Sequence, residues 1–200
     1  MKFPNFWLLF FLAGSTLQAG SALLECIGDT WIDAKRPDDA HSKDLDLELA
    51  GKQKLALMNF QFAVIRDWKV QRATLLLHLD DITPLKMLGV VPVSVRWNEI
   101  EATASRAAEK LPWDANGPLQ TLLGKFDSNQ ANYRPVKEGD LGWVEVDLPP
   151  SLIEDCAAGR SHGFALFVRR RDGARLIHSR DTVRYAPTLK VEGQPRQRGD

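Results

Sequence analysis

Alternation of apolar and polar residues with a period of two runs through most of this chain, and it constrains the fold more than any other feature. Each alternating run is short and is bounded by Gly, Pro, Asn or Asp, as strands of antiparallel sheets are. The apolar sets that share a face are Leu75, Leu77 and Leu79; Val91, Val93, Val95 and Trp97; Val144, Val146 and Leu148; and Phe164, Leu166 and Val168. The pattern predicts an all-β fold, an antiparallel sandwich in which each strand buries one face.

Two segments carry helical signals instead. Residues 149–159 contain Ser151 and Glu154 at capping-box spacing and end at Gly159, which predicts a helix of about two turns. Residues 102–110 are rich in Ala and Glu, and they are interpreted as either a second short helix or an irregular connection.

One turn and the C-terminus are also informative. Asp172-Gly173 separates the strand-like residues 164–171 and 174–179, and this dipeptide predicts that the two runs pair as a hairpin. The polar residues 193–200 contain Gly, Pro and Arg, which predicts a flexible tail.

The N-terminus has the order of a secretory signal peptide: a basic residue, an apolar run over residues 6–13, then small and polar residues up to Ala22. That run is about half of the roughly 20 residues that a membrane-spanning helix needs, so no permanent membrane span is expected. Cleavage after Ala19 and cleavage after Ala22 both fit. We interpret residues 1–22 as a signal peptide and residues 23–192 as one domain, and we expect a secreted, periplasmic or cell-surface protein.

Charge and motifs exclude several classes of function. Basic and acidic residues number 26 each, whereas a nucleic-acid-binding domain carries a strongly basic surface. The histidines lack the spacing of a zinc site, and neither a nucleophile elbow nor a phosphate-binding glycine loop occurs. The sequence therefore predicts a protein that is not an enzyme and does not bind nucleic acid.

Cys26 and Cys156 are the only cysteines, and in an exported protein such a pair is most simply a disulfide. The bridge would close a loop of roughly 130 residues, which the chain-entropy model values at about 5 kcal/mol. Two alternatives are a lipid anchor on Cys26, which Glu25 disfavours, and two free thiols in a chain that is not exported.

Carboxylates in the loop after the first strand offer oxygen ligands for Ca²⁺: Asp38, Asp39, Asp44 and Asp46. Their spacing matches no calcium-loop signature, so a solvated loop is favoured. No cofactor is predicted.

Seven short motifs occur in an order that resembles the DNRLRE domain, a disaggregatase-related, carbohydrate-binding-module-like family of exported β-sandwiches. They are residues 29–32, 57–60, 70–75, 97–99, 142–147, 163–166 and 179–181 with 187–189. Two departures are Asp181, where the family usually has Glu, and the missing Thr-Trp pair after Glu99. The resemblance covers residues 29–192 and implies a jelly-roll-like sandwich that binds polysaccharides, often acidic ones, without catalysis.

Sugar recognition combines aromatic planes with polar or charged side chains, and the predicted ligand-binding residues follow from this. They are Trp113, Tyr133, Trp143, Arg169, Arg170 and Arg171. The three arginines, with Arg175 across the predicted hairpin, would present guanidinium groups to a carboxylate or sulfate. The alternative interpretation is a charged hairpin tip that protects a sheet edge. Trp97 and Trp31 are predicted to belong to the core.

The sequence thus predicts a noncatalytic carbohydrate-binding module for a polysaccharide, possibly an acidic one. The alternative is a structural or protein-contact module of the cell surface or matrix. A polysaccharide-degrading enzyme is the least favoured hypothesis, and the oligomeric state is not predicted.

Overall fold

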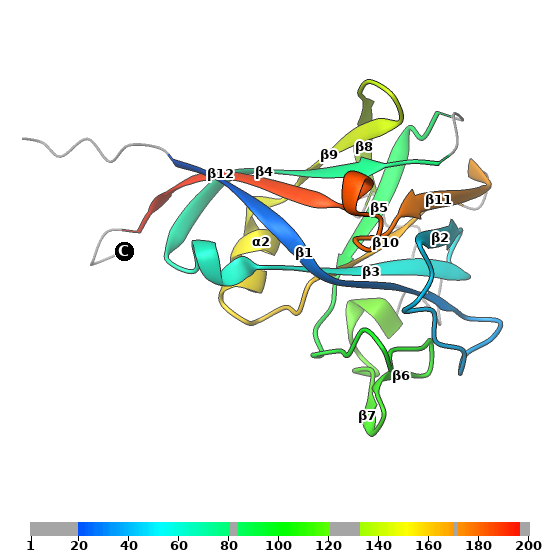
Figure 1. The fold of residues 1–200 in the computed structure, drawn as a ribbon. Coiled ribbons are helices and arrows are strands. Elements are labelled where there is room, and N and C mark those ends of the chain that lie inside the picture. Colours follow the sequence, from blue (N-terminus) through cyan, green and yellow to red (C-terminus); the bar gives the residue numbers. More distant parts are fainter. Residues whose placement is uncertain (1–19, 81–83, 121–132, 170–171, 197–200) are drawn as a thin grey trace, which may run out of the picture.

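The computed structural model describes residues 20–80, 84–120, 133–169 and 172–196, and these form an antiparallel β-structure (Figure 1). Its main sheet has ten strands. In chain order these are β1 (Gly20–Asp33), β2 (Asp46–Ala50), β3 (Lys54–Phe60), β4 (Trp68–His78), β5 (Met87–Pro92), β8 (Tyr133–Glu138), β9 (Trp143–Leu148), β10 (Phe164–Phe167), β11 (Ala174–His178) and β12 (Thr188–Pro195). The predicted all-β, antiparallel class is confirmed.

The hydrogen bonding closes on itself in the order β1-β12-β4-β9-β8-β5-β10-β3-β1. Closure depends on two strands that change partners along their length. Residues 20–25 of β1 pair with β12, and residues 26–33 pair with β3, with a register irregularity between Cys26 and Gly28. Residues 133–135 of β8 pair with β5, and residues 136–138 pair with β9. These strands therefore form a closed barrel. Two separate sheets would instead have edge strands with unpaired backbone groups.

The barrel interior holds three of the four predicted apolar faces, whereas the set of Val91, Val93, Val95 and Trp97 belongs to a second, outer cluster. Leu75 and Leu77 of β4 and Val146 of β9 are fully buried, as are Leu189 and Val191 of β12. Removing this apolar surface from water supplies the main driving force for closing the barrel.

A second apolar cluster lies on the outer face of β3, β5 and β10. Ala165 and Phe167 of β10 point into it, so β10 is buried on both faces and not on the single face that the alternation predicts. The loop region between β5 and β8 covers this face and includes the small hairpin of β6 (Arg106–Ala108) and β7 (Leu111–Pro112), beneath β3 in Figure 1. The close approach requires Gly89, since a Cβ there would lie 2.3 Å from the Phe167 ring.

The predicted helix at residues 149–159 is present as α2 (Pro150–Ala157), and Gly159 follows it with φ +73°. Its N-cap is Pro149, without a side-chain cap, so the predicted capping box does not form. The helical interpretation of residues 102–110 is wrong, because β6 occupies part of that segment.

The predicted pairing of β10 with β11 is also wrong. Strands β3 and β5 take both edges of β10, so β11 pairs with β2 instead. The tail is shorter than predicted, because residues 193–195 extend β12 and pair with β4. At the other end, residues 20–22 belong to β1 and pair with β12; the rest of the predicted signal peptide lies outside the described residues.

Candidate functional site

Three of the sequence motifs meet in one partly buried polar network, although they lie far apart in the chain. The Arg180 guanidinium donates two hydrogen bonds to Glu99, from Nε at 2.9 Å and from Nη2 at 2.8 Å. Asp29 accepts hydrogen bonds from Ser179 Oγ at 3.0 Å and from the Arg180 amide at 2.7 Å. The Asp29 amide in turn donates to Glu99 Oε1 at 3.1 Å. These contacts hold β1, residues 97–99 and the segment after β11 together.

Burial controls the electrostatics of this network. Asp29 is only 2% exposed, and this desolvation raises the pKa of its carboxyl group to about 6. The hydrogen bonds from the Arg180 amide and from Ser179 act in the opposite direction and lower the pKa. The hydrogen bonds from Arg180 to Glu99 raise the pKa of the Arg180 guanidinium. Both carboxyl groups therefore have fixed partners, and this network, here called the clamp, ties the segment that carries Trp97 to β1 and to Arg180.

Trp97 forms one wall of an open groove of about 490 Å³, here called the Trp97 groove. The indole is half-buried, and its Nε1 donates to the His162 carbonyl at 2.8 Å. Other lining residues come from β1, from the end of β3, from η1 (Phe62–Ile65) and from the segment around the end of α2. They are Ile27, Asn59, Phe60, Gln61, Phe62, Ala63, Arg96, Cys156, Gly159, Ser161 and His162.

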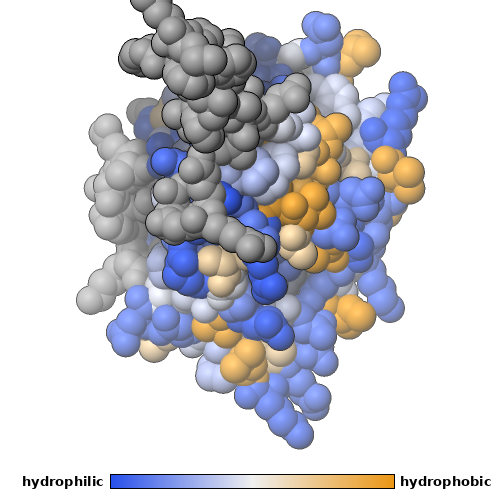
Figure 2. Space-filling view, turned by 90° about the vertical axis from the view of Figure 1, so that its left-hand side faces the viewer, coloured by the Kyte–Doolittle hydropathy of each residue, from blue (hydrophilic) through white to orange (hydrophobic). Residues whose placement is uncertain are grey.

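The groove combines an aromatic wall, amides, a hydroxyl group and a cation. Burial, together with the charge of the exposed Arg96, lowers the pKa of the His162 imidazole. Arg96 brings a positive charge to the groove. Figure 2 shows apolar side chains gathered on the end of the molecule where β1 begins, among hydrophilic ones.

Trp113 was predicted to bind ligand, but the structure buries it. It is 6% exposed, its Nε1 donates to the Thr103 carbonyl at 2.8 Å, and it belongs to the outer apolar cluster. The loop that carries Trp113 covers the outer face of the sheet, so this ring is part of the packing there.

Tyr133 is also buried, at 8% exposure, against the edge of Phe167. The Arg169 guanidinium lies over the Tyr133 ring at 4.7 Å, so the structure does bring these two predicted residues together. Arg175 is buried as well and donates to the Ala174 carbonyl. Arg170 and Arg171 lie outside the described residues.

Trp143 lies at the opposite, half-exposed face of β9, as predicted. Its ring contacts His78 edge-on at 5.3 Å and lies 6.4 Å from Tyr185, which belongs to η4 (Val183–Tyr185). His78 stacks on Tyr185 at 3.9 Å. Trp143 is thus part of a separate aromatic cluster at the mouth of the barrel.

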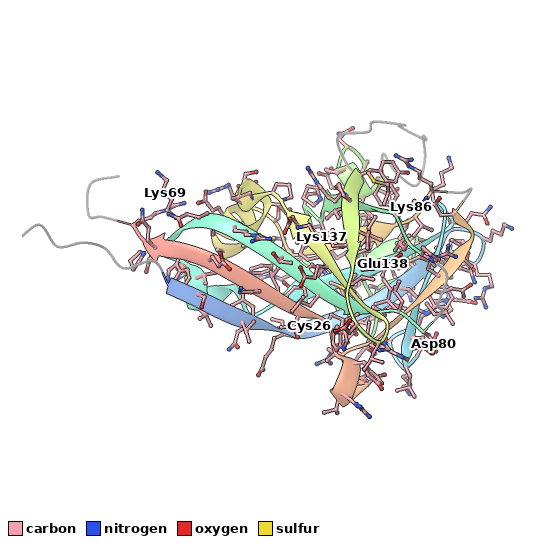
Figure 3. The ribbon with its side chains drawn as sticks, turned by 90° about the horizontal axis from the view of Figure 1, so that it is seen from above. Cys26, Lys69, Asp80, Lys86, Lys137 and Glu138 are labelled. Atoms are coloured by element: carbon pink, nitrogen blue, oxygen red, sulfur yellow. The ribbon has the colours of Figure 1, made fainter. Side chains whose placement is uncertain are left out.

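The predicted disulfide is absent, because Cys26 and Cys156 are free thiols in the structure. Cys26 Sγ contacts the Gly28 carbonyl at 3.5 Å, and Cys156 Sγ contacts the Gly163 carbonyl at 3.8 Å. Helix α2, which carries Cys156, packs on β4 and η1, while Cys26 lies along β1, as labelled in Figure 3. Burial raises the pKa of both thiols, that of Cys156 to about 12.

The aspartates considered as calcium ligands turn to separate partners. Asp38 accepts from Ser105, Asp39 pairs with Arg36, Asp44 accepts from the Trp31 indole, and Asp46 contacts His178. Trp31 is buried as predicted. Among the described residues, no group of three or more His, Cys, Asp or Glu side chains is arranged to hold a metal ion.

A scan against protein-family models and a search of curated proteins find no match to this chain. The DNRLRE resemblance therefore stays a prediction that rests on the motifs. Within the described ranges, no helix has both the length and the apolar character needed to cross a membrane.

Proposed function

We propose that this protein is an exported, noncatalytic carbohydrate-binding module and that polysaccharide binds in the Trp97 groove. The observation that carries the proposal is the half-buried indole of Trp97 beside Arg96, in a groove of about 490 Å³ lined by amide and hydroxyl side chains. An aromatic ring packs against the apolar face of a sugar ring, and the polar groups fix its hydroxyls. The volume lies within the usual range of about 300–1,000 Å³ for ligand sites.

The state of the nearby carboxylates favours binding over hydrolysis. A glycoside hydrolase needs two carboxyl groups placed on either side of the scissile bond. Here Glu99 accepts two hydrogen bonds from Arg180, and Asp29 accepts from Ser179 and the Arg180 amide. These acids hold the groove wall in place, and their oxygens are already engaged.

The DNRLRE resemblance supports the same function, since the motifs that carry it build this clamp. Under this proposal the barrel corresponds to the jelly-roll-like sandwich that the resemblance implies, and β1 and β8, which each change partners along their length, would join its two sheets. Export would fit cleavage after Ala19, because β1 then keeps residues 20–22, which pair with β12.

Affinity electrophoresis through gels that contain xylan, β-glucan, pectin, alginate or chondroitin sulfate tests the proposal. The native protein is expected to be retarded by at least one gel, and both Trp97→Ala and Arg96→Gln are expected to weaken the retardation. Lys69→Gln is the charge-matched control for Arg96→Gln, because Lys69 is exposed and is not among the groove residues. Unchanged retardation of both groove variants would refute the site, and the folded state of each variant is checked by its Tm.

A second candidate function is contact with another protein at the barrel mouth. Leu141 and Val183 are each 90% exposed, and both adjoin the aromatic cluster: His78 Nε2 donates to the Leu141 carbonyl, and Val183 shares η4 with Tyr185. Leu141 also has φ +55°, an uncommon conformation for a residue with a side chain. Stoichiometric co-purification of a partner that Leu141→Ser/Val183→Ser abolishes, without glycan retention, would favour this function.

A further inference from the structure

A small hollow lies where α2 meets the end of β5 and the start of β8. Its volume is about 200 Å³, and it is here called the Arg134 pocket. It shares no lining residue with the Trp97 groove, so the two hollows are separate sites. Strands β5 and β8, together with α2 and the residue before it, supply the lining: Val90, Pro92, Arg134, Pro149, Ser151, Leu152 and Asp155.

Arg134 stands on the interior face of the barrel wall. Side chains alternate along a strand, and Tyr133 belongs to the outer apolar cluster, whereas Val136 packs against the interior cluster. Arg134 therefore shares the face of Val136. Its partner across the ladder on β5 is Leu88, which is fully buried in the interior cluster. The strand pattern thus brings a positive charge to a face that is otherwise apolar.

The Nε atom of Arg134 is buried, and within the described part of the chain it has no hydrogen-bond partner. A buried donor on a charged group is costly unless an acceptor contacts it, and an ion or a water molecule often fills that role in folded proteins. The residue as a whole is half-buried, so the pocket gives a small ligand access to the guanidinium. An oxyanion is the acceptor that suits this group best, because a guanidinium can bind two of its oxygens at once.

Asp155 adds a carboxylate to the same pocket, and this restricts which oxyanion can enter. The Arg160 side chain binds Asp155 from Nε at 2.8 Å and from Nη2 at 2.6 Å, and both contacts go to Oδ1. No side chain of the described residues donates a hydrogen bond to Oδ2. Oδ2 can therefore accept a proton from a ligand, and the Ser151 hydroxyl can donate to one.

We propose that the Arg134 pocket binds inorganic phosphate in its hydrogen phosphate form. Two phosphate oxygens accept hydrogen bonds from the Arg134 guanidinium, and the P–OH group donates to Oδ2 of Asp155. Sulfate carries no proton at neutral pH, so the Asp155 carboxylate repels it and accepts nothing from it. The pocket is large enough for an ion of this size. This site is independent of polysaccharide binding in the Trp97 groove.

Isothermal titration calorimetry of the purified protein with sodium phosphate and with sodium sulfate, at pH 7.5 and constant ionic strength, tests the proposal. Phosphate is expected to bind about tenfold or more tightly than sulfate, because a hydrogen bond to a charged group is worth at least this factor. Arg134→Gln is expected to weaken phosphate binding by a similar factor. Absence of phosphate binding to the native chain, or equal binding of the two anions, would overturn the proposal.

Asp155→Asn and a phosphate ester test the part that the phosphate proton plays. The asparagine amide carries no negative charge and can donate a hydrogen bond, so this variant is expected to bind sulfate as tightly as phosphate. Glycerol 3-phosphate has mostly lost its second proton at pH 7.5, since that pKa is about 6, and it should bind the native chain as weakly as sulfate. A phosphate preference that survives in Asp155→Asn, or tight binding of the ester, would contradict the hydrogen bond to Oδ2.

Arg184→Gln is the control, since Arg184 is exposed, does not line the pocket and undergoes the same change of side chain. It is expected to leave phosphate binding unchanged. Equal losses in Arg184→Gln and Arg134→Gln would show attraction to the overall charge and would overturn the site. Thermal denaturation checks the fold of each variant, and phosphate should raise the Tm of the native chain but not that of Arg134→Gln.

Discussion

Arg180 and Glu99 form a two-point ion pair across 81 residues of sequence, with donor–acceptor distances of 2.9 and 2.8 Å. This contact joins the segment after β11 to the segment that carries Trp97. It makes the segment that carries Trp97 dependent on two residues that are not among those lining the groove.

Breaking this pair should destabilise the fold and loosen Trp97. Glu99→Ala leaves the Arg180 guanidinium and the Asp29 amide without their acceptor, and we expect a loss of about 2–3 kcal/mol. Urea denaturation measures it, and tryptophan emission reports the change around Trp97. Arg72→Ala at the exposed pair with Asp147 is the control, with an expected loss of less than about 1 kcal/mol. Equal losses for the two variants would contradict the clamp.

Stability should depend on the ionisation of Asp29. Its pKa of about 6 in the folded state lies above the ordinary aspartate value of 3.8. The folded state therefore binds the Asp29 proton more tightly than the unfolded state does. The resulting contribution to the free energy of unfolding is complete below about pH 4 and is lost as pH rises through 6. The shift corresponds to about 3 kcal/mol.

Asp29→Asn isolates this effect, because asparagine does not titrate. The free energy of unfolding of the native chain, relative to that of Asp29→Asn, should fall by about 3 kcal/mol between pH 4 and pH 7. Chemical denaturation across this range measures the difference. A constant difference at all pH values would show that Asp29 does not titrate in this window.

Both cysteines should react as thiols. Labelling of the denatured, unreduced protein is expected to find Cys26 and Cys156 free, as the structure has them. In the native protein, labelling should be slow, because burial raises the pKa of each thiol and thiolate is the reactive form. Recovery of no free thiol after denaturation would instead establish the disulfide that the sequence suggested.

Gly89→Ala should be strongly destabilising. The added Cβ would lie 2.3 Å from the Phe167 ring, and overpacking of this kind costs about 1–3 kcal/mol or more. Gly159→Ala is the contrast, since nothing lies within 4 Å of its Cβ and only the strain of φ +73° remains. Phe167→Leu should partly rescue Gly89→Ala. Thermal denaturation of all three variants measures these effects, and an unchanged Tm for Gly89→Ala would contradict the close packing.

Alternation predicted the strand faces well because the barrel interior buries one face of each strand, as at Leu75 and Leu77. It could not reveal that the loop between β5 and β8 folds over the outer face, and so it misplaced Trp113 in solvent. Trp97 was predicted as core because it continues the Val91 face. It does pack, partly buried, against the outer cluster that contains Val91, but β5 ends at Pro92 and the indole also lines a groove. Asp29, Glu99 and Arg180 lay within the quoted motifs, but only the closed fold brings them into contact.

Binding of purified residues 20–200 to the gel panel tests most directly whether polysaccharide binds in the Trp97 groove. We expect retardation that both Trp97→Ala and Arg96→Gln weaken and that Lys69→Gln leaves intact. No retardation of the native protein in any gel, with calcium or with chelator, would contradict polysaccharide binding and would favour the protein-contact surface at Leu141 and Val183.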